Sequence, residues 1–155
     1  MAQGGRPGRV PVMFHPFAYD EKHRTWLARF SGTLTEQDLV ASDVATRECL
    51  ARHGPAAGLL DFSCVDSMAV TVAETVSRGL RPQIMVGQKR AIVANGVVFG
   101  MMRIFGTYQS RDSLEPMVMH TLPEAYEALG LPAHDFQPVA LSTPLAPVSP
   151  ASLGA

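Results

Sequence analysis

Long apolar runs and a strong net charge are both missing from this chain of 155 residues. No stretch approaches the roughly 20 apolar residues that a membrane-spanning helix needs. The 13 basic residues are balanced by 14 acidic ones, so no basic surface for the phosphates of nucleic acid is predicted. We therefore expect a cytoplasmic protein with no transmembrane segment and no nucleic-acid partner.

Motifs for catalysis and metal binding are missing as well. The two cysteines, Cys49 and Cys64, form no C-x-x-C pair, and we expect both to be buried free thiols. The five histidines are scattered, and no pair has the spacing of metal ligands on a helix. Ser63 or Ser67 with His120 and a nearby aspartate could supply the groups of a hydrolase, but no Gly-x-Ser-x-Gly elbow is present. The sequence predicts no metal, no cofactor and no enzyme.

The hydrophobic content of 46% is that of a globular protein. Residues 1–11 are rich in glycine, proline and arginine, which predicts a flexible leader. Residues 12–131 carry the periodic apolar patterns and are expected to form one domain. Residues 132–155 contain five prolines and almost no charge, which is typical of a disordered tail.

Apolar periodicity predicts alternating strands and helices in that domain. The expected strands are 12–19, 25–30, 58–62, 89–94 and 115–120, and the expected helices are 35–53, 69–80, 97–108 and 122–129. The helix at 35–53 has the weakest apolar face, because its apolar residues are widely spread. Residues 82–88 fit either a loop or an extra strand. The fold class is therefore α/β: a mixed, mostly parallel sheet of about five strands with four helices.

Five stretches of the sequence are similar to those of a known protein family. They are Trp26 to Gly32, Leu59 to Ser63, Lys89 to Ala94, Phe99 to Phe105 and Leu122 to Leu129. With this element order the chain resembles the SpoIIAA-like proteins, bacterial relatives of the STAS domain that are related in fold to CRAL-TRIO lipid-binding domains. The resemblance implies a non-catalytic module for protein–protein interaction in bacterial regulation, with an unknown protein partner or a homodimer. The alternative function is binding of a small apolar or anionic ligand.

STAS anti-sigma factor antagonists carry a phosphorylatable serine after such a strand. The resemblance places that role on Ser67, in Asp66-Ser67, although Met68 and Ala69 replace the residues that follow in the family. Five polar residues are expected at the carboxyl ends of the parallel strands, where open sheets bind ligands. They are Ser63, Asp66, Ser67, Asn95 and Thr121. Helix N-termini there favour an anion, while the simpler interpretation is helix capping alone.

A methionine-rich region offers a second candidate site. Met101, Met102 and Phe105 lie on the third predicted helix, and Met117 and Met119 lie on the last predicted strand. Soft, adaptable side chains of this kind suit an apolar groove for a lipid or for a partner helix. Filling of the core is the alternative interpretation.

Overall fold

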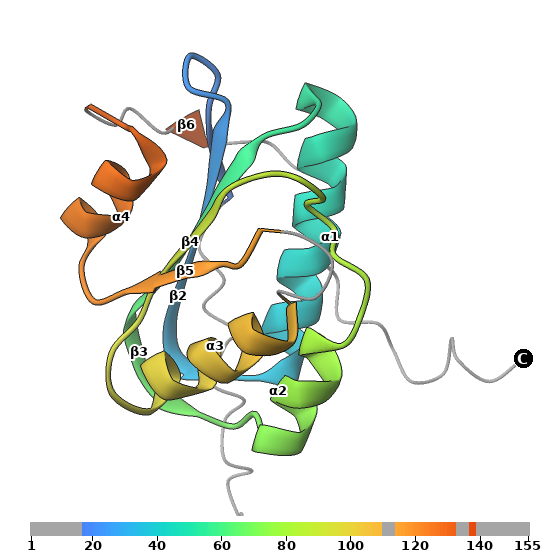
Figure 1. Cartoon of the computed structure of the whole chain (residues 1–155), viewed down its shortest axis with the longest axis vertical. Coiled ribbons are helices and arrows are strands. Elements are labelled where there is room, and N and C mark those ends of the chain that lie inside the picture. Colours follow the sequence, from blue (N-terminus) through green and yellow to red (C-terminus); the bar gives the residue numbers. More distant parts are fainter. Residues whose placement is uncertain (1–16, 110–113, 133–136, 139–155) are drawn as a thin grey trace, which may run out of the picture.

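In the part of the chain that the structure describes, four helices pack on a six-stranded mixed sheet (Figure 1). The computed structural model describes residues 17–109, 114–132 and 137–138. The strands are β1 (Ala18–Asp20), β2 (Thr25–Leu34), β3 (Ala57–Met68), β4 (Arg90–Val93), β5 (Met117–Met119) and β6 (Gln137–Pro138). The helices are α1 (Glu36–His53), α2 (Val72–Gly79), α3 (Gly96–Gln109) and α4 (Leu122–Leu129). The predicted α/β class is confirmed. The predicted leader and most of the predicted tail lie outside the described residues.

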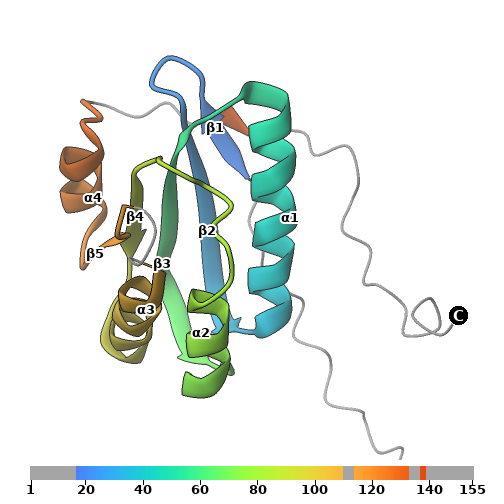
Figure 2. The ribbon, with the colours of Figure 1, turned by 45° about the vertical axis from the view of Figure 1, so that its right-hand side comes forward.

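The sheet order is β5-β4-β3-β2-β1-β6. Strands β2 to β5 run parallel, whereas β1 is antiparallel to both β2 and β6. Helices α1 and α2 cover one face of the sheet and α4 covers the other (Figure 2). Side chains of α1 and α3, such as Leu39 and Met102, join the larger apolar cluster with Trp26 and Phe62. A smaller cluster around Leu59 and Ala125 lies beneath α4.

The predicted helix boundaries follow from capping chemistry. Thr35 accepts a hydrogen bond from the Asp38 N–H at 3.2 Å, and the Asp38 carboxylate accepts one from the Thr35 N–H at 2.8 Å. This reciprocal capping box starts α1 where the sequence predicts it. Gly54, at φ 81°, ends the helix. Thr121 likewise caps α4, and Gly130 at φ 70° ends that helix with a Leu131 N–H to Tyr126 carbonyl bond.

Two strands are longer than predicted. Gly32 does not end β2, because its φ of 75° coincides with a shift in register that lets pairing continue to Leu34. Strand β3 runs on to Met68 instead of ending at Phe62. Beyond Asp61 it pairs with β2 alone among the described strands, so its polar residues can remain exposed. The predicted loop at 63–67 is therefore wrong, and the segment 82–88 is a loop without a strand.

In the predicted helix 69–80 the apolar residues Val72, Val76 and Leu80 recur at helical spacing and are expected to face the core. Helix α2 is rotated relative to this apolar stripe. It begins at Val72 after the cap Thr71, and its buried residues are Thr75 and Gly79. A Cβ at Gly79 would lie 2.8 Å from the Cβ of Tyr108, so the missing side chain lets α2 approach α3 closely. This contact turns the predicted stripe outward, and Val72 and Leu80 are 56% and 55% exposed.

The two cysteines differ in environment. Cys49 is buried as predicted, and burial raises the pKa of its thiol to about 11. Cys64 is exposed on the extended part of β3, which corrects the prediction for that residue. Neither forms a disulfide. Of the helices in the described part of the chain, none has the length and apolar character to cross a membrane.

Candidate functional site

The five polar residues predicted at the carboxyl ends of the parallel strands, which we call the polar rim, do not all lie together in the structure. Pairing of Asp61 with Val93 puts Asn95, two residues on, level with Ser63. Thr121 follows β5 at about the same height, since Val93 pairs with Met119. Ser67 lies four residues beyond Ser63, or about 13 Å at ~3.3 Å per residue. It is part of β3 and does not start a helix, so its predicted role in capping is wrong.

Local contacts already occupy three of the predicted rim side chains. The Ser67 hydroxyl lies 2.8 Å from that of Thr33 on β2. The Thr121 hydroxyl caps α4, and the Asn95 side chain contacts His120 at 3.4 Å. Asp66 is exposed on β3. These local contacts account for Ser67, Asn95 and Thr121, and phosphorylation of Ser67 stays a prediction.

The methionine-rich residues do not line one groove. Met101 and Met102 are 7% and 5% exposed, which makes them part of the core. Met102 and Phe105 contribute to a cavity on the α1 face of the sheet. Met119 packs in the cluster beneath α4, on the opposite face, and Met117 borders a separate hollow beside Arg103 and Pro116.

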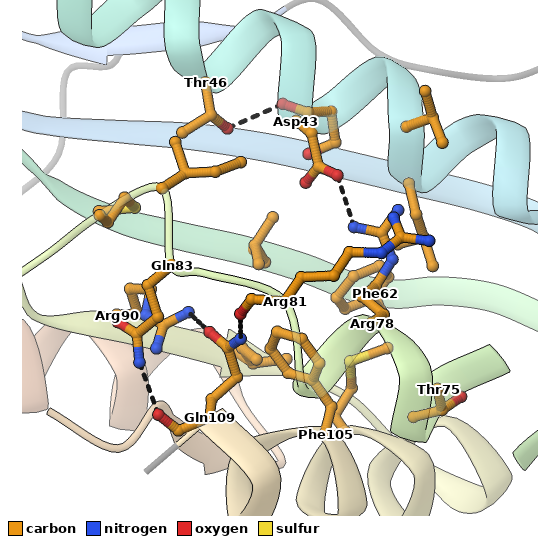
Figure 3. Close-up of a pocket in the computed structure, with 18 of the residues that line it drawn as sticks. Asp43, Thr46, Phe62, Thr75, Arg78, Arg81, Gln83, Arg90, Phe105 and Gln109 are labelled. Carbon is orange, nitrogen blue, oxygen red and sulfur yellow. Dashed lines mark hydrogen bonds and ion pairs between the residues drawn. The ribbon is translucent and has the colours of Figure 1, made fainter. Parts of the chain in front are cut away.

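The cavity on the α1 face is the best-formed candidate site. It has a volume of about 250 Å³ and lies between the sheet, α1, α2 and α3, with the connection from α2 to β4 along one side (Figure 3). Its lining is largely apolar. The apolar lining residues are Trp26, Leu39, Val40, Leu60, Phe62, Met68, Pro82, Ile84, Met85, Ile92, Met102 and Phe105. A concave lining that is mainly apolar, with polar side chains at its sides, is typical of a small-molecule site.

The floor of the cavity follows from strand alternation. Side chains two residues apart point to the same face, so Leu60, Phe62 and Ile92 line the cavity while Leu59, Ala91 and Val93 face α4. Trp26 is 2% exposed and stacks on Phe17 with ring centroids 5.0 Å apart. The floor is therefore a rigid part of the sheet.

Polar side chains stand at two sides of this floor. Arg78 reaches from α2 to α1 and binds Asp43 at 2.6 Å and Glu36 at 3.4 Å. Arg81 lies 4.0 Å from the same Glu36 carboxylate. These pairs fasten α2 to the amino-terminal half of α1. In Figure 3, Arg78 stands on one side of the cavity and Arg90 on the other.

Gln109, the last residue of α3, organises the Arg90 side. Its side-chain N–H groups donate to the carbonyls of Gly79 and Arg81 at 3.1 and 3.2 Å. Its side-chain oxygen accepts from the Arg90 guanidinium at 2.9 Å, and its carbonyl accepts from Gln83 at 2.6 Å. Gln109 is only 6% exposed. This buried amide fixes α2, α3 and the start of β4 around one end of the cavity.

Several buried polar atoms of the lining residues have no hydrogen-bond partner in the described structure. They are Nε1 of Trp26, Nε of Arg78, Nε of Arg90 and the side-chain oxygen of Gln83. Unpartnered buried polar atoms are costly and uncommon in folded proteins. Three of the four are donors, so a molecule in the cavity would chiefly have to supply acceptors.

Sequence reasoning missed this cavity, although α1 carried a signal of it. The buried side of α1 includes Ser42 and Thr46, and both line the cavity. A helix whose inward face is partly polar has a weak apolar stripe in its sequence. The predicted helix at 35–53 has such a stripe. The weak stripe therefore marked a helix that borders a cavity.

The described residues contain no group of three or more histidine, cysteine, aspartate or glutamate side chains that could hold a metal ion. The arrangement around the cavity is suited to binding, because an apolar floor lies between the ion-paired Arg78 and the side that carries Arg90. Comparison of the chain with protein-family models and with curated proteins found no match.

Proposed function

We propose that this protein is a non-catalytic binding module whose ligand is a small molecule with an apolar body, held between the sheet and helices α1 to α3. The observation that carries the proposal is the cavity of about 250 Å³ with its apolar lining. At roughly 30 Å³ for each water molecule, its volume matches a ligand of about eight non-hydrogen atoms.

Rigid surroundings support this function. Ligand sites are usually preformed, because ordering a loose site would consume binding free energy. Here the floor belongs to the central strands β2, β3 and β4, and ion pairs join α1 to α2. A ligand could therefore bury its apolar surface without large rearrangement of the protein.

The test uses the tryptophan as a reporter. Trp26 is the single tryptophan of the chain and lines the cavity, so binding of 1-octanol should change its fluorescence in a saturable way. We expect a Kd on the order of 0.1 mM, from about 0.6 kcal/mol for each non-hydrogen atom. At tenfold excess over Kd the midpoint of thermal unfolding should rise by about 3–5 °C.

A pair of variants on α1 locates the site. Ser42 is buried and lines the cavity, so Ser42→Phe fills it and should raise the Kd for octanol at least about tenfold. Val44 is 43% exposed and lies outside the lining, so Val44→Phe should leave the Kd unchanged. An absent fluorescence response in the unmodified protein, or equal Kd values for both variants, would contradict the proposal.

A second candidate function is protein–protein interaction, as in STAS-like modules. The outward stripe of α2 favours it: Val72 and Leu80 are more than half exposed, and Val76 lies between them at the same helical spacing. Exposed apolar side chains on one helix face are a common feature of contact surfaces. The simplest occupant is a second copy of the chain.

Sedimentation over a range of protein concentrations tests this second function. We expect dimers of the unmodified protein and monomers of the double variant Val72→Glu, Leu80→Glu, because two buried carboxylates would oppose association. The control Val44→Glu, on the exposed side of α1, should behave as the unmodified protein. A monomer at every concentration would rule out the dimer.

A further inference from the structure

Three residues of neighbouring strands form one row across the floor of the cavity. Trp26 pairs with Gly58, and Gly58 pairs with Arg90. A Cβ at Gly58 would lie 2.4 Å from Cζ2 and 2.7 Å from Cε2 of Trp26. The indole therefore lies over Gly58 and extends along the row toward Arg90. The glycine lets an N–H donor of the indole and a guanidinium share one edge of the cavity.

The charge of Arg90 is not compensated within the described structure. Its two hydrogen bonds go to neutral oxygens, the side chain of Gln109 at 2.9 Å and the carbonyl of Leu114 at 3.4 Å. Its Nε is buried without a partner. Burial also lowers the pKa of Arg90 to about 10, so the side chain remains a cation at neutral pH. A partly buried cation whose Nε is fully buried and which has no counter-ion among the described residues is unfavourable.

The other arginines beside the cavity differ in this respect. Arg78 is bound by the carboxylates of Asp43 and Glu36, and Arg81 lies near Glu36. Arg47 is exposed to solvent on α1. Arg90 is therefore the cation whose charge a bound molecule would best complement.

We infer that the ligand is a monocarboxylate whose head group pairs with Arg90 and whose apolar body lies over Trp26, Leu60 and Phe62. This inference rests on the proposed function and names its ligand class. One uncompensated guanidinium matches one negative charge, which favours a carboxylate over a doubly charged phosphate monoester. The volume of about 250 Å³ suits a medium-length chain or a single substituted ring.

Octanoate and 1-octanol form a matched pair that differs in the head group. At neutral pH we expect octanoate to bind at least about tenfold more tightly than octanol, by Trp26 fluorescence and by calorimetry. An apolar cavity without a free cation would show the opposite order, because desolvation of a carboxylate is costly. Octyl phosphate is the third ligand, and tighter binding of it than of octanoate would overturn the carboxylate assignment.

Substitution of Arg90 tests the head-group contact. Arg90→Gln should weaken octanoate binding at least about thirtyfold and change octanol binding less than about twofold. Arg90→Lys, which keeps the charge, should restore most of the preference for octanoate. The control Arg103→Gln removes an exposed arginine of α3 outside the cavity and should change neither Kd.

The outcomes separate the two proposals. Binding of octanol without a preference for octanoate overturns the carboxylate inference and leaves the proposed function standing. Absence of binding by all three ligands overturns both. If Arg90→Gln does not fold, the order of octanoate and octanol in the unmodified protein still decides the inference.

Discussion

Gly58→Ala should lower the free energy of unfolding by about 2–3 kcal/mol, although it adds only one methyl group. The added Cβ would lie 2.4 Å from the indole of Trp26 and 3.0 Å from the end of Met85. Both side chains are buried, at 2% and 4% exposure, so the indole has little room to move and the variant is overpacked. Denaturant unfolding followed by circular dichroism measures the loss independently of the tryptophan signal.

Gly100→Ala is the matched control for this substitution. A Cβ at Gly100 would meet no atom within 4 Å, and this residue lies within α3. Alanine favours a helix over glycine by about 0.5–1 kcal/mol, so this variant should be more stable than the unmodified protein. Equal stability of Gly58→Ala and the unmodified protein would show that the indole does not lie over Gly58.

Phe62→Ala should cost about 3–5 kcal/mol of unfolding free energy, the range for removing a buried aromatic ring. Phe62 is 1% exposed and stacks on Phe30 with ring centroids 4.6 Å apart. Because Phe62 also lines the cavity, its removal should enlarge the cavity and let longer carboxylates bind. Thermal unfolding with and without added ligand measures both effects.

Phe99→Ala provides the comparison for Phe62. Phe99 is half-buried on α3 and stacks on the exposed His120, away from the cavity. Its loss should cost about 1–2 kcal/mol and leave ligand binding unchanged. A cost for Phe62→Ala no larger than that for Phe99→Ala would contradict the position of Phe62 in the core.

Local chemistry made much of the fold predictable. The capping box of Thr35 and Asp38 and the stop at Gly54 are encoded within a few residues, and α1 has the predicted limits. Strand β3 was predicted too short, because its continuation depends on pairing with β2, more than thirty residues earlier in the chain. The outward stripe of α2 was misread for a similar reason: the contact of Gly79 with α3 sets the rotation of that helix.

The candidate site depends on distant residues even more strongly. Trp26, Gly58 and Arg90 come from three strands, and only the register of the parallel sheet brings them into one row. In the sequence each has an ordinary explanation: a core aromatic residue, a strand glycine and a residue that begins a strand. The predicted rim residues carry polar side chains at strand ends, a pattern that capping and strand pairing produce without a ligand.

The separation of α4 from the other helices has a practical consequence. Its side chains pack against the sheet face that bears Leu59, Ala91 and Val93, whereas the cavity lies on the opposite face. Glu127 is exposed on α4. A surface tether or fused domain attached at Glu127 would be separated from the ligand by the whole β-sheet. Such an attachment should therefore leave access to the cavity unobstructed.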